Sequence, residues 1–247
     1  MIDIHSHILP GIDDGARSIY DTLEMAQTAV QNGIHTMVAT PHCNVPGEYD
    51  NYFGKHYEKT YLQAVKAIRK EGIPLRLLPG MEVYVTEEVP DLMVQGKIMP
   101  LNQTHYLLVE FGFAEDPQFA EYMLERITAK GVTPVIAHVE RYYFVQDDPS
   151  VIRQWLKKGY VIQVNKGSYQ GRFGRKEQKT AYQLTDENLV SVIATDTHRP
   201  YRRTPKMDEV YADLLNDYSE RYLKVLLEEN PKRICMDRKV LIHKGVL

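Results

Sequence analysis

The amino-acid sequence predicts an α/β protein whose parallel strands form a closed or nearly closed barrel. Short apolar runs, such as residues 106–109 and 190–194, suit strands covered on both faces, and they alternate with stretches of helical periodicity. The chain has 247 residues, which matches the ~250 residues typical of such barrels. Histidines and carboxylates follow most of the apolar runs, at the strand ends where active sites of these barrels form. We therefore expect one domain over residues 1–247.

Seven strands are expected, each from a short run rich in apolar residues. Their ranges are Met1–His5, Thr36–Thr40, Leu75–Val83, His105–Phe111, Thr133–Val139, Tyr160–Val164 and Ser191–Thr195. The segment Asn44–Gly54 is polar and aromatic and is expected to be a loop.

Helices are expected between these strands. The first, Ser18–Asn32, repeats apolar residues at helical spacing and is closed by Gly33. The others span Lys55–Glu71, Pro117–Lys130, Pro149–Lys158 and Arg172–Glu187. The chain turns helical again after Pro205. The tail from about residue 231 carries clustered positive charge, and we assign it no role.

Composition excludes several classes of function. The 30 basic and 33 acidic residues give a formal net charge of −3, which argues against a protein that binds nucleic acid through its overall field. No apolar run approaches the ~20 residues needed to cross a bilayer, and the N-terminus lacks a signal-peptide pattern. We expect a cytoplasmic protein without membrane insertion. Cys43 and Cys235 are too few for a disulfide framework. An oligomeric state is not predicted.

Two short motifs have the residue spacing of a metal site. His5 and His7 are separated by one residue, and Asp196 and His198 repeat that spacing near the other end of the chain. In an extended strand, residues i and i+2 point to one face, so each pair presents two ligands to a common point.

Further candidate ligands follow the other strands. His42, Glu82, Glu110 and His138 lie at or near the ends of the second to fifth strands, and Asp14 lies in the loop after the first. A single histidine at a strand end is more often structural. The repetition of the pattern at most strand ends indicates one metal-binding mouth. Imidazoles and carboxylates without thiolates favour manganese, zinc or iron.

The motifs around these residues resemble those of the polymerase and histidinol phosphatase (PHP) superfamily. Within it, the match is to bacterial tyrosine-protein phosphatases of capsule and exopolysaccharide loci, over residues 1 to about 215. The segments that carry the resemblance are Asp3–Pro10, Asp13–Gly15, Thr40–His42, Pro79–Glu82, Ala137–Tyr142 and Thr195–His198. The resemblance implies a distorted seven-stranded TIM-like barrel (PHP fold) with a trinuclear metal centre.

It also implies a ligand set for three divalent ions, with manganese expected and zinc or iron as alternatives. The first ion would take His5, His7, Glu82 and Asp196; the second Glu82 as a bridge, Glu110 and His138; the third Asp14, His42 and His198. Asp14 is expected among the catalytic groups as well.

Arg141 and Arg203 match the phosphate-contacting arginines of the family. A guanidinium can pair bidentately with phosphoryl oxygens. The alternative for Arg141 is an ion pair with Glu140, and Arg199 and Arg202 compete with Arg203 for the role.

The implied activity is that of a metal-dependent protein-tyrosine phosphatase, in which metals lower the pKa of a bound water from 15.7 towards ~7. A cysteine-dependent mechanism needs an arginine six residues after the nucleophile, but Tyr49 and Leu241 occupy those positions. The implied partner is a bacterial tyrosine autokinase with a phosphorylated tyrosine-rich tail. The alternatives are a histidinol-phosphate or other small-molecule phosphatase, and a metal-binding module without activity.

Aromatic residues in two loops are candidates for a wall around a phenyl ring. They are Tyr49, Tyr52 and Phe53 in the first loop and Tyr169 and Phe173 in the second. Packing within the loops explains them equally well, and no general acid is identified.

Overall fold

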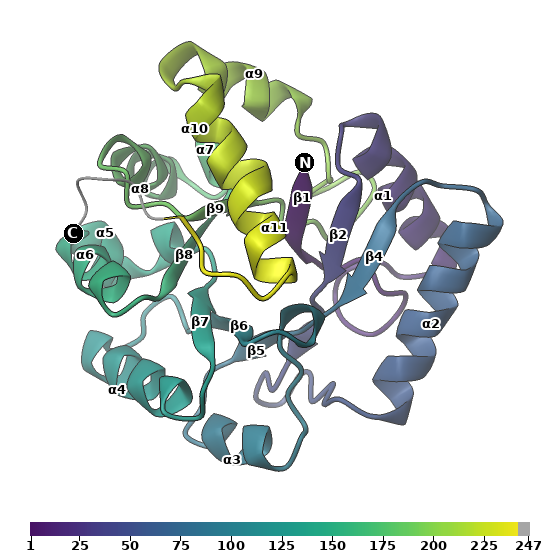
Figure 1. Ribbon diagram of the computed structural model, residues 1–247, viewed down its shortest axis with the longest axis horizontal. Coiled ribbons are helices and arrows are strands. Elements are labelled where there is room, and N and C mark those ends of the chain that lie inside the picture. The colour runs from purple at the N-terminus through teal and green to yellow at the C-terminus, as the bar shows by residue number, and fades with distance from the viewer. Residues whose placement is uncertain (242–247) are drawn as a thin grey trace.

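Nine strand segments form the centre of the molecule within residues 1–241, the part of the chain that this computed structural model describes (Figure 1). They are β1 (Ile2–Ser6), β2 (Thr36–Ala39), β3 (His42–Cys43), β4 (Arg76–Pro79), β5 (Glu82–Tyr84), β6 (Tyr106–Glu110), β7 (Thr133–Ile136), β8 (Val161–Asn165) and β9 (Val192–Ala194). One sheet has the order β1-β2-β4 and the other the order β3-β5-β6-β7-β8-β9. Strand pairing within both sheets is parallel, as expected for βα units.

The strands at the second and third positions each pass from one sheet to the other. The expected second strand ends at Ala39 and is followed by the additional segment β3, whereas the expected third strand breaks before Glu82, so β3 and β5 continue β2 and β4 in the other sheet. Pro41 has no N–H to donate to a ladder. Gly80 is packed so closely that an added Cβ would lie 2.9 Å from a methyl carbon of Val38. The segments therefore occupy seven positions in the order β1, β2/β3, β4/β5, β6, β7, β8 and β9.

The last strand returns to the first. The Asp196 N–H donates to the His5 carbonyl at 3.0 Å, and the His7 N–H donates to the Thr197 carbonyl at 2.8 Å. The Asp3 carboxylate also accepts a hydrogen bond of 3.0 Å from the Thr195 N–H. These contacts join β1 to the segment after β9, and the predicted distorted seven-stranded α/β barrel is confirmed.

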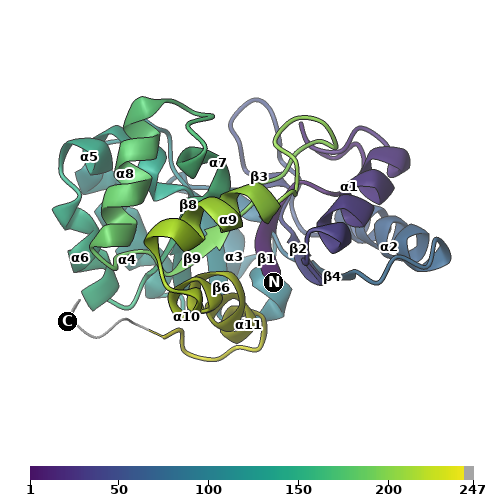
Figure 2. The same cartoon turned by 90° about the horizontal axis from the view of Figure 1, so that it is seen from above.

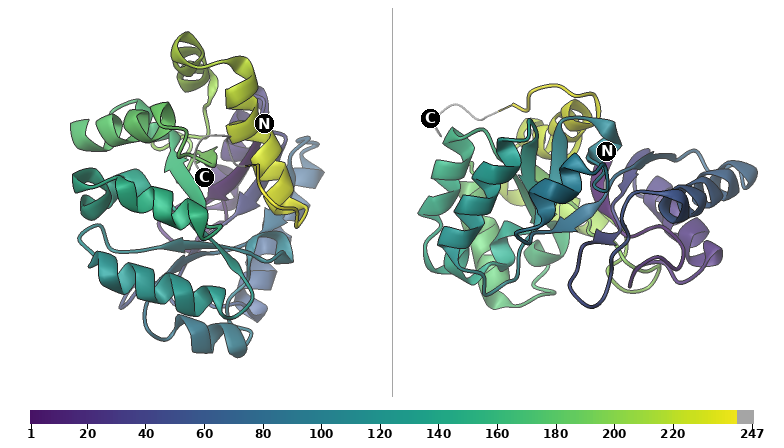
Figure 3. Two further views of the ribbon diagram at one scale, coloured as in Figure 1. Left: turned by 60° about the vertical axis from the view of Figure 1, so that its left-hand side comes forward. Right: turned by 90° about the horizontal axis from the view of Figure 1, so that it is seen from below.

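Helices cover the outside of the strands (Figures 1 and 2). The α-helices are α1 (Ile19–Gln31), α2 (Lys55–Lys70), α3 (Val89–Val94), α4 (Pro117–Thr128), α5 (Tyr143–Asp147), α6 (Ser150–Lys157), α7 (Lys166–Tyr169), α8 (Arg175–Asp186), α9 (Asp208–Asp217), α10 (Glu220–Lys224) and α11 (Asn230–Cys235). Three further turns are the 3₁₀ segments η1 (Leu101–Gln103) and η2 (Val139–Arg141) and the π segment η3 (Val225–Glu229). The first expected helix is confirmed as α1, and the Ser18 side chain caps it by accepting from the Asp21 N–H. Helices α4, α6 and α8 lie beside β6 to β9, whereas α1 and α2 lie beside β1, β2 and β4 (Figures 1 and 3).

Apolar side chains pack on both faces of the strands. Leu107 and Val109 of β6 belong to the cluster that includes the outer helices, while Leu108 belongs to a second cluster formed mainly by strand residues. This alternation has the two-residue period of a strand. Because both faces of the strands are buried, each polar residue within them, such as Asp3 in β1 or Gln163 in β8, needs a hydrogen-bond partner.

The tail from residue 231 closes the end of the barrel away from the strand C-termini. Ile234 of α11 belongs to the strand-residue cluster, and the Asn102 amide donates to the Cys235 carbonyl at 2.9 Å. Asp237 accepts a hydrogen bond of 2.7 Å from the N–H of His105, just before β6. This part of the tail therefore has a packing role, and residues 242–247 lie outside the described residues. In residues 1–241, none of the helices has the length and apolar character needed to span a membrane.

Candidate metal centre

The nine candidate ligands converge at the C-terminal ends of the strands. They come from β1 and the loop after it, from β3, β5 and β6, and from the turns after β7 and β9. His138 and Asp196 have positive backbone φ angles of 37° and 49°, a conformation that is uncommon for residues other than glycine. Each lies where its strand ends, and such strained residues cluster at functional sites. The sequence-predicted convergence is therefore present in the structure.

Glu82 lies at the centre of the cluster. Its Oε1 is 3.1 Å from His5 Nε2 and 2.9 Å from His138 Nε2. Its Oε2 is 3.2 Å from His7 Nε2 and 3.1 Å from His42 Nδ1. Both carboxylate oxygens thus face two imidazoles each, which is the arrangement a bridging ligand requires.

Asp196 and Asp14 extend the cluster. Asp196 Oδ1 is 3.4 Å from His5 Nε2, from His7 Nε2 and from His198 Nδ1. Asp14 Oδ1 lies 3.4 Å from His198 Nε2, and about half of the Asp14 side chain is exposed. Asp14 therefore lies at the open edge of an otherwise buried group.

Glu110 completes the cluster beside His42 and His138. Its Oε1 is 3.0 Å from His42 Nδ1, and its Oε2 is 3.6 Å from His138 Nε2. Asp14 Oδ1 also lies 3.6 Å from the other nitrogen of His42. His42 is thus the residue that connects the Glu82 and Glu110 side of the cluster with Asp14.

The donor set fits divalent metal ions. Glu82 Oε2, Asp196 Oδ1 and His198 Nε2 are buried atoms that make no hydrogen bond within residues 1–241, although buried polar atoms are normally satisfied. The Nε2 atoms of His5 and His7 are only 3.3 Å apart. Three groups have ligand atoms close enough to share an ion: His7, Asp14, His42 and His198; His5, His7 and Asp196; His42, Glu82 and Glu110. Imidazole and carboxylate donors suit manganese, zinc or iron.

Without metal, the cluster is an array of coupled ion pairs. Burial alone would raise the pKa of Glu82, but His5 and the other histidines around it hold that pKa well below its usual value. Burial alone would lower the pKa of His42, but Glu82 and Glu110 raise it to about 9. Burial would likewise lower the pKa of His138, but hydrogen bonds and charge interactions with Glu110 and Glu82 raise it to about 9. In the metal-free protein, protonated His42 and His138 thus balance the negative charge of Glu82 and Glu110, as bound metal ions would.

Comparison with known proteins identifies the family. The family described as capsular polysaccharide synthesis, CpsB/CapC, matches residues 1–236. The chain belongs to the CpsB/CapC family. The tyrosine-protein phosphatase YwqE of Bacillus subtilis (strain 168) is 36% identical over 240 residues, which cover 97% of this chain and 93% of that protein. The tyrosine-protein phosphatase CpsB of Streptococcus pneumoniae is 29% identical over 245 residues, covering 97% of this chain and 100% of that protein.

Solved structures agree with this assignment. A structure reported for YwqE from Bacillus subtilis and CpsB from Streptococcus pneumoniae, described as unique metal-dependent tyrosine phosphatases, matches with a TM-score of 0.90 and 35% identity over 98% of this chain and 97% of that one. A resiniferatoxin-binding protein from Rhodobacter sphaeroides matches with a TM-score of 0.63 at 10% identity, over 98% and 92% of the two chains, and shows the fold alone. The predicted family resemblance is confirmed.

A second set of residues in this CpsB/CapC-family chain orients the ligands. His7 Nδ1 lies 2.7 Å from Asp13 Oδ2, and His5 Nδ1 lies 3.0 Å from Gln163 Oε1. The Asn165 amide donates to Asp196 Oδ2 at 2.6 Å. Such partners fix the ring orientation and tautomer of metal-binding histidines. No role was predicted for these partners, although Gln163 is a polar residue between apolar neighbours in β8, a signal that could have singled it out.

Arg141 lies between two aromatic rings. Its guanidinium carbon is 4.1 Å from the centroid of Phe113 and 4.5 Å from that of Phe173. The alternative ion pair with Glu140 is wrong, because the buried Glu140 carboxylate instead accepts from the Asn165 N–H at 3.0 Å and from the Ser168 hydroxyl at 2.6 Å. The stacking leaves the edge of the Arg141 fork available for a ligand.

Arg203 occupies a different position from Arg141. Its guanidinium pairs with Asp196 Oδ2, and its backbone φ is 52°. The Arg203 carbonyl accepts from the His198 N–H at 2.9 Å, so the residue is tied to the ligand turn through both its backbone and its side chain. Of its competitors, Arg202 is exposed, while Arg199 has a buried Nη1 atom that makes no hydrogen bond within residues 1–241.

Both cysteines are buried in apolar surroundings. Burial raises the pKa of the Cys43 thiol and that of the Cys235 thiol to about 12. A thiolate is therefore disfavoured at both positions, in agreement with the exclusion of cysteine chemistry from the sequence.

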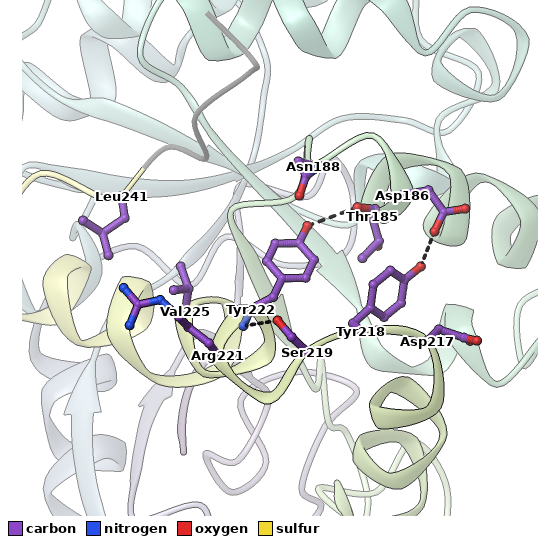
Figure 4. A pocket seen from close by; sticks show the side chains of 10 residues that line it. All are labelled: Thr185, Asp186, Asn188, Asp217, Tyr218, Ser219, Arg221, Tyr222, Val225 and Leu241. Atoms are coloured by element: carbon purple, nitrogen blue, oxygen red, sulfur yellow. Dashed lines mark hydrogen bonds between the residues drawn. The ribbon is translucent and has the colours of Figure 1, made fainter.

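A cavity of about 800 Å³ lies away from the ligands. It is formed around α8, α9 and α10, with Tyr218 and Tyr222 in its wall (Figure 4). The Tyr218 hydroxyl donates to Asp186 at 2.6 Å, and the Tyr222 hydroxyl donates to the Thr185 carbonyl at 3.2 Å. None of the nine candidate ligands lines it. A smaller cavity of about 240 Å³ adjoins the cluster and is lined by Asp14, His42 and Glu110 among others.

Proposed function

We propose that this CpsB/CapC-family protein is a metal-dependent phosphatase that hydrolyses phosphotyrosine in a partner protein, with residues 1–247 acting as one domain. The observation that carries the proposal is the buried cluster of imidazoles and carboxylates around Glu82, which has more ligand atoms than hydrogen bonds can satisfy. The names of its relatives as tyrosine-protein phosphatases support the choice of reaction.

We assign the cluster to three divalent ions, with manganese as the expected metal and zinc or iron as alternatives. The first ion would be held by His5, His7, Glu82 and Asp196; the second by Glu82, Glu110 and His138; the third by Asp14, His42 and His198. The central position of Glu82 supports its role as a bridge. Bound ions of this kind lower the pKa of water and offset the charge of a phosphoryl group.

The chain's own residues bind and orient the phosphate. Arg141 presents its guanidinium at the mouth, where the Phe113 and Phe173 rings limit its rotation. A pre-oriented guanidinium loses less entropy when it forms a bidentate contact with two phosphoryl oxygens. Arg203 holds Asp196 and so positions a ligand, and it is close enough to the site to contact a bound phosphate as well.

Phosphotyrosine suits this site because it needs little general acid catalysis. The conjugate acid of a tyrosine leaving group has a pKa of ~10, whereas a serine alkoxide lies nearer the 15.7 of water. We further propose that the substrate is a bacterial tyrosine autokinase, because the family is defined by capsular polysaccharide synthesis.

The test compares two substrates on the metal-loaded protein. We expect kcat/KM for a phosphotyrosyl peptide to exceed that for histidinol phosphate by orders of magnitude. The reverse preference would assign the protein to the small-molecule phosphatases, and no turnover of either substrate would make it a non-catalytic metal-binding module.

A double variant links the activity to the metals. His5→Ala/His7→Ala removes two imidazoles from the first ion, so we expect phosphatase activity and bound metal to be lost together while circular dichroism still shows a folded barrel. Full turnover by the folded, metal-depleted variant would contradict the proposal.

A further inference from the structure

The cavity of about 240 Å³ beside the metal-ligand cluster combines ligands with aromatic side chains. Its lining includes the candidate ligands Asp14, His42 and Glu110 and the aromatic residues Tyr49, Tyr84 and Phe113. The cavity thus opens directly on the atoms that would hold metal. Aromatic faces next to a charged centre are suited to a ligand with one apolar and one anionic end.

We propose that this cavity binds the aryl ring of the substrate and thereby selects aryl over alkyl phosphomonoesters. This inference rests on the proposed phosphatase function and assigns a specific place to the ring. A cavity of about 150 Å³ is enough for benzene, while pockets for drug-sized ligands measure roughly 300–1,000 Å³. A volume of about 240 Å³ therefore suits a single ring with its substituents.

The walls of the cavity contact both groups that are proposed to hold the phosphate, the metal-ligand cluster and Arg141. The ring of Tyr49 stacks on that of His42, with centroids 5.9 Å apart and an interplanar angle of 10°. On the other side, the Phe113 ring lies 4.1 Å from the guanidinium carbon of Arg141. A phosphate held by the ligand cluster and Arg141 would therefore have its ester group next to this cavity.

The charge of the lining favours a neutral ring. Neither lysine nor arginine is among the residues that line the cavity, and its charged members are Asp14, Glu48 and Glu110. Glu48 lies at the exposed rim. A second anionic group on the substrate, beyond the phosphate, would face Glu48, the charged lining residue that is not a candidate metal ligand, and would find no lysine or arginine in the lining to pair with.

Gly112 and Tyr84 provide a way to alter the cavity without touching a ligand. A Cβ added at Gly112 would lie 3.0 Å from the Tyr84 hydroxyl oxygen, and Gly112 has no positive φ angle that would strain an alanine. Gly112→Ala should therefore displace the Tyr84 ring. Tyr84→Phe removes the crowded hydroxyl while keeping the ring, so the double variant should relieve the displacement.

The experiment measures KM for phenyl phosphate and the inhibition constant of inorganic phosphate on the metal-loaded enzyme. We expect Tyr84→Ala and Gly112→Ala to raise KM by about 3- to 10-fold, the scale of one aromatic contact, with the phosphate inhibition constant and the metal content unchanged. Gly112→Ala/Tyr84→Phe should return KM to near the parental value. Tyr122→Ala, which truncates an exposed tyrosine on α4, is the matched control and should change neither constant.

Three results would overturn the assignment of the ring. A KM for phenyl phosphate unchanged in Tyr84→Ala and Gly112→Ala places the ring elsewhere. Equal rises in KM and in the phosphate inhibition constant make the cavity part of the phosphate site. If KM for phenyl phosphate in Gly112→Ala/Tyr84→Phe is as high as in Gly112→Ala, the contact with the Tyr84 hydroxyl does not explain the effect. Failure of the proposed function looks different, because the parent protein itself would then turn over neither phenyl phosphate nor a phosphotyrosyl peptide.

Discussion

Arg141 shows how a charged side chain can be oriented without a counter-charge. Its guanidinium is held by the faces of Phe113 and Phe173, while the nearest acidic residue in sequence, Glu140, is engaged elsewhere. An arginine in an ion pair would have to break that pair before it could bind phosphate. Stacking on rings gives orientation while leaving the N–H donors free.

We expect Arg141→Ala to lower kcat by about 10²- to 10³-fold, the scale observed when one preorganised transition-state donor is removed. Arg141→Lys should recover only part of the rate, because an ammonium keeps the charge but lacks the planar fork. The measurements are kcat and KM on a phosphotyrosyl peptide, with metal content and melting temperature as controls. Parental kcat in both variants, or loss of metal from Arg141→Ala, would make Arg141 a structural residue.

Replacing the two cysteines, in contrast to replacing Arg141, should have little effect on activity. Since burial raises the pKa of both thiols to about 12, neither is a nucleophile at neutral pH. Replacing Cys43 and Cys235 by Ala should keep kcat within several-fold of the parent, and iodoacetamide should label the protein only after denaturation. Complete loss of activity in a Cys43→Ala protein that still binds its metals would contradict this prediction.

Strand β8 contributes to the site although it carries no candidate ligand. Gln163 Oε1 lies 3.0 Å from His5 Nδ1 and also accepts from the His138 N–H at 3.2 Å. The Gln163 amide in turn donates to Asn165 at 2.8 Å, and Asn165 donates to Asp196. One strand thus orients ligands of β1, of the turn after β7 and of the turn after β9.

We expect Gln163→Leu to weaken metal binding by about 10- to 100-fold, the usual effect of losing an outer partner of a ligating histidine. Gln163→Glu keeps an acceptor oxygen beside His5 and should retain most of the affinity. Competition with a metal-binding dye measures the change. Val161→Ala on the same strand is the control: it should lower the melting temperature without altering the affinity. Equal metal affinity in Gln163→Leu and the parent would exclude the orienting role.

The elements also show what sequence can and cannot predict. Strand and helix positions follow from apolar periodicity, and α1 agrees with its expected range to within one residue at each end. The passage of the second and third strands from one sheet to the other depends on packing between distant segments, such as Gly80 against Val38, which a linear pattern does not contain. Most of the candidate ligands were found because they lie at or near strand ends, and Asp14 because it lies in the loop after the first strand. Their partners, such as Gln163 and Asn165, were missed because their role exists only once β8 lies beside β1 and β9.

Across the whole molecule, the residues that stabilise the fold and the residues of the candidate metal centre lie in different regions. The two apolar clusters and α11 hold the strands together, whereas the ionisable groups gather at the opposite end of the barrel. Removing metal should therefore leave the fold intact. Bound metal should still add stability by mass action, to the extent that it binds the folded chain more tightly than the unfolded one.

The protonation of the cluster makes metal binding depend on pH. In the metal-free protein the pKa values of His42 and His138 are raised to about 9, above the ~6.5 of an unperturbed histidine, so both rings are protonated at pH 7. A ligating imidazole must be neutral. Metal binding therefore competes with protons at these two residues, and the apparent affinity should rise as the pH increases towards 9.

We expect full metal loading at pH 7 to release roughly three protons, one each from His42, His138 and His7, whose pKa Asp13 also raises well above its usual value, and fewer as the pH rises above 9. Titration calorimetry in buffers of different ionisation enthalpy measures this number. The sign for stability is the reverse in the metal-free protein: because the folded pKa values exceed the unfolded ones, the ion pairs of these histidines stabilise fully below pH 6.5 and are lost as the pH rises through 9. The melting temperature of the chelator-treated protein should thus fall over that range while that of the metal-loaded protein does not. Proton release that stays constant from pH 7 to pH 10 would show that these histidines are already neutral before metal binds.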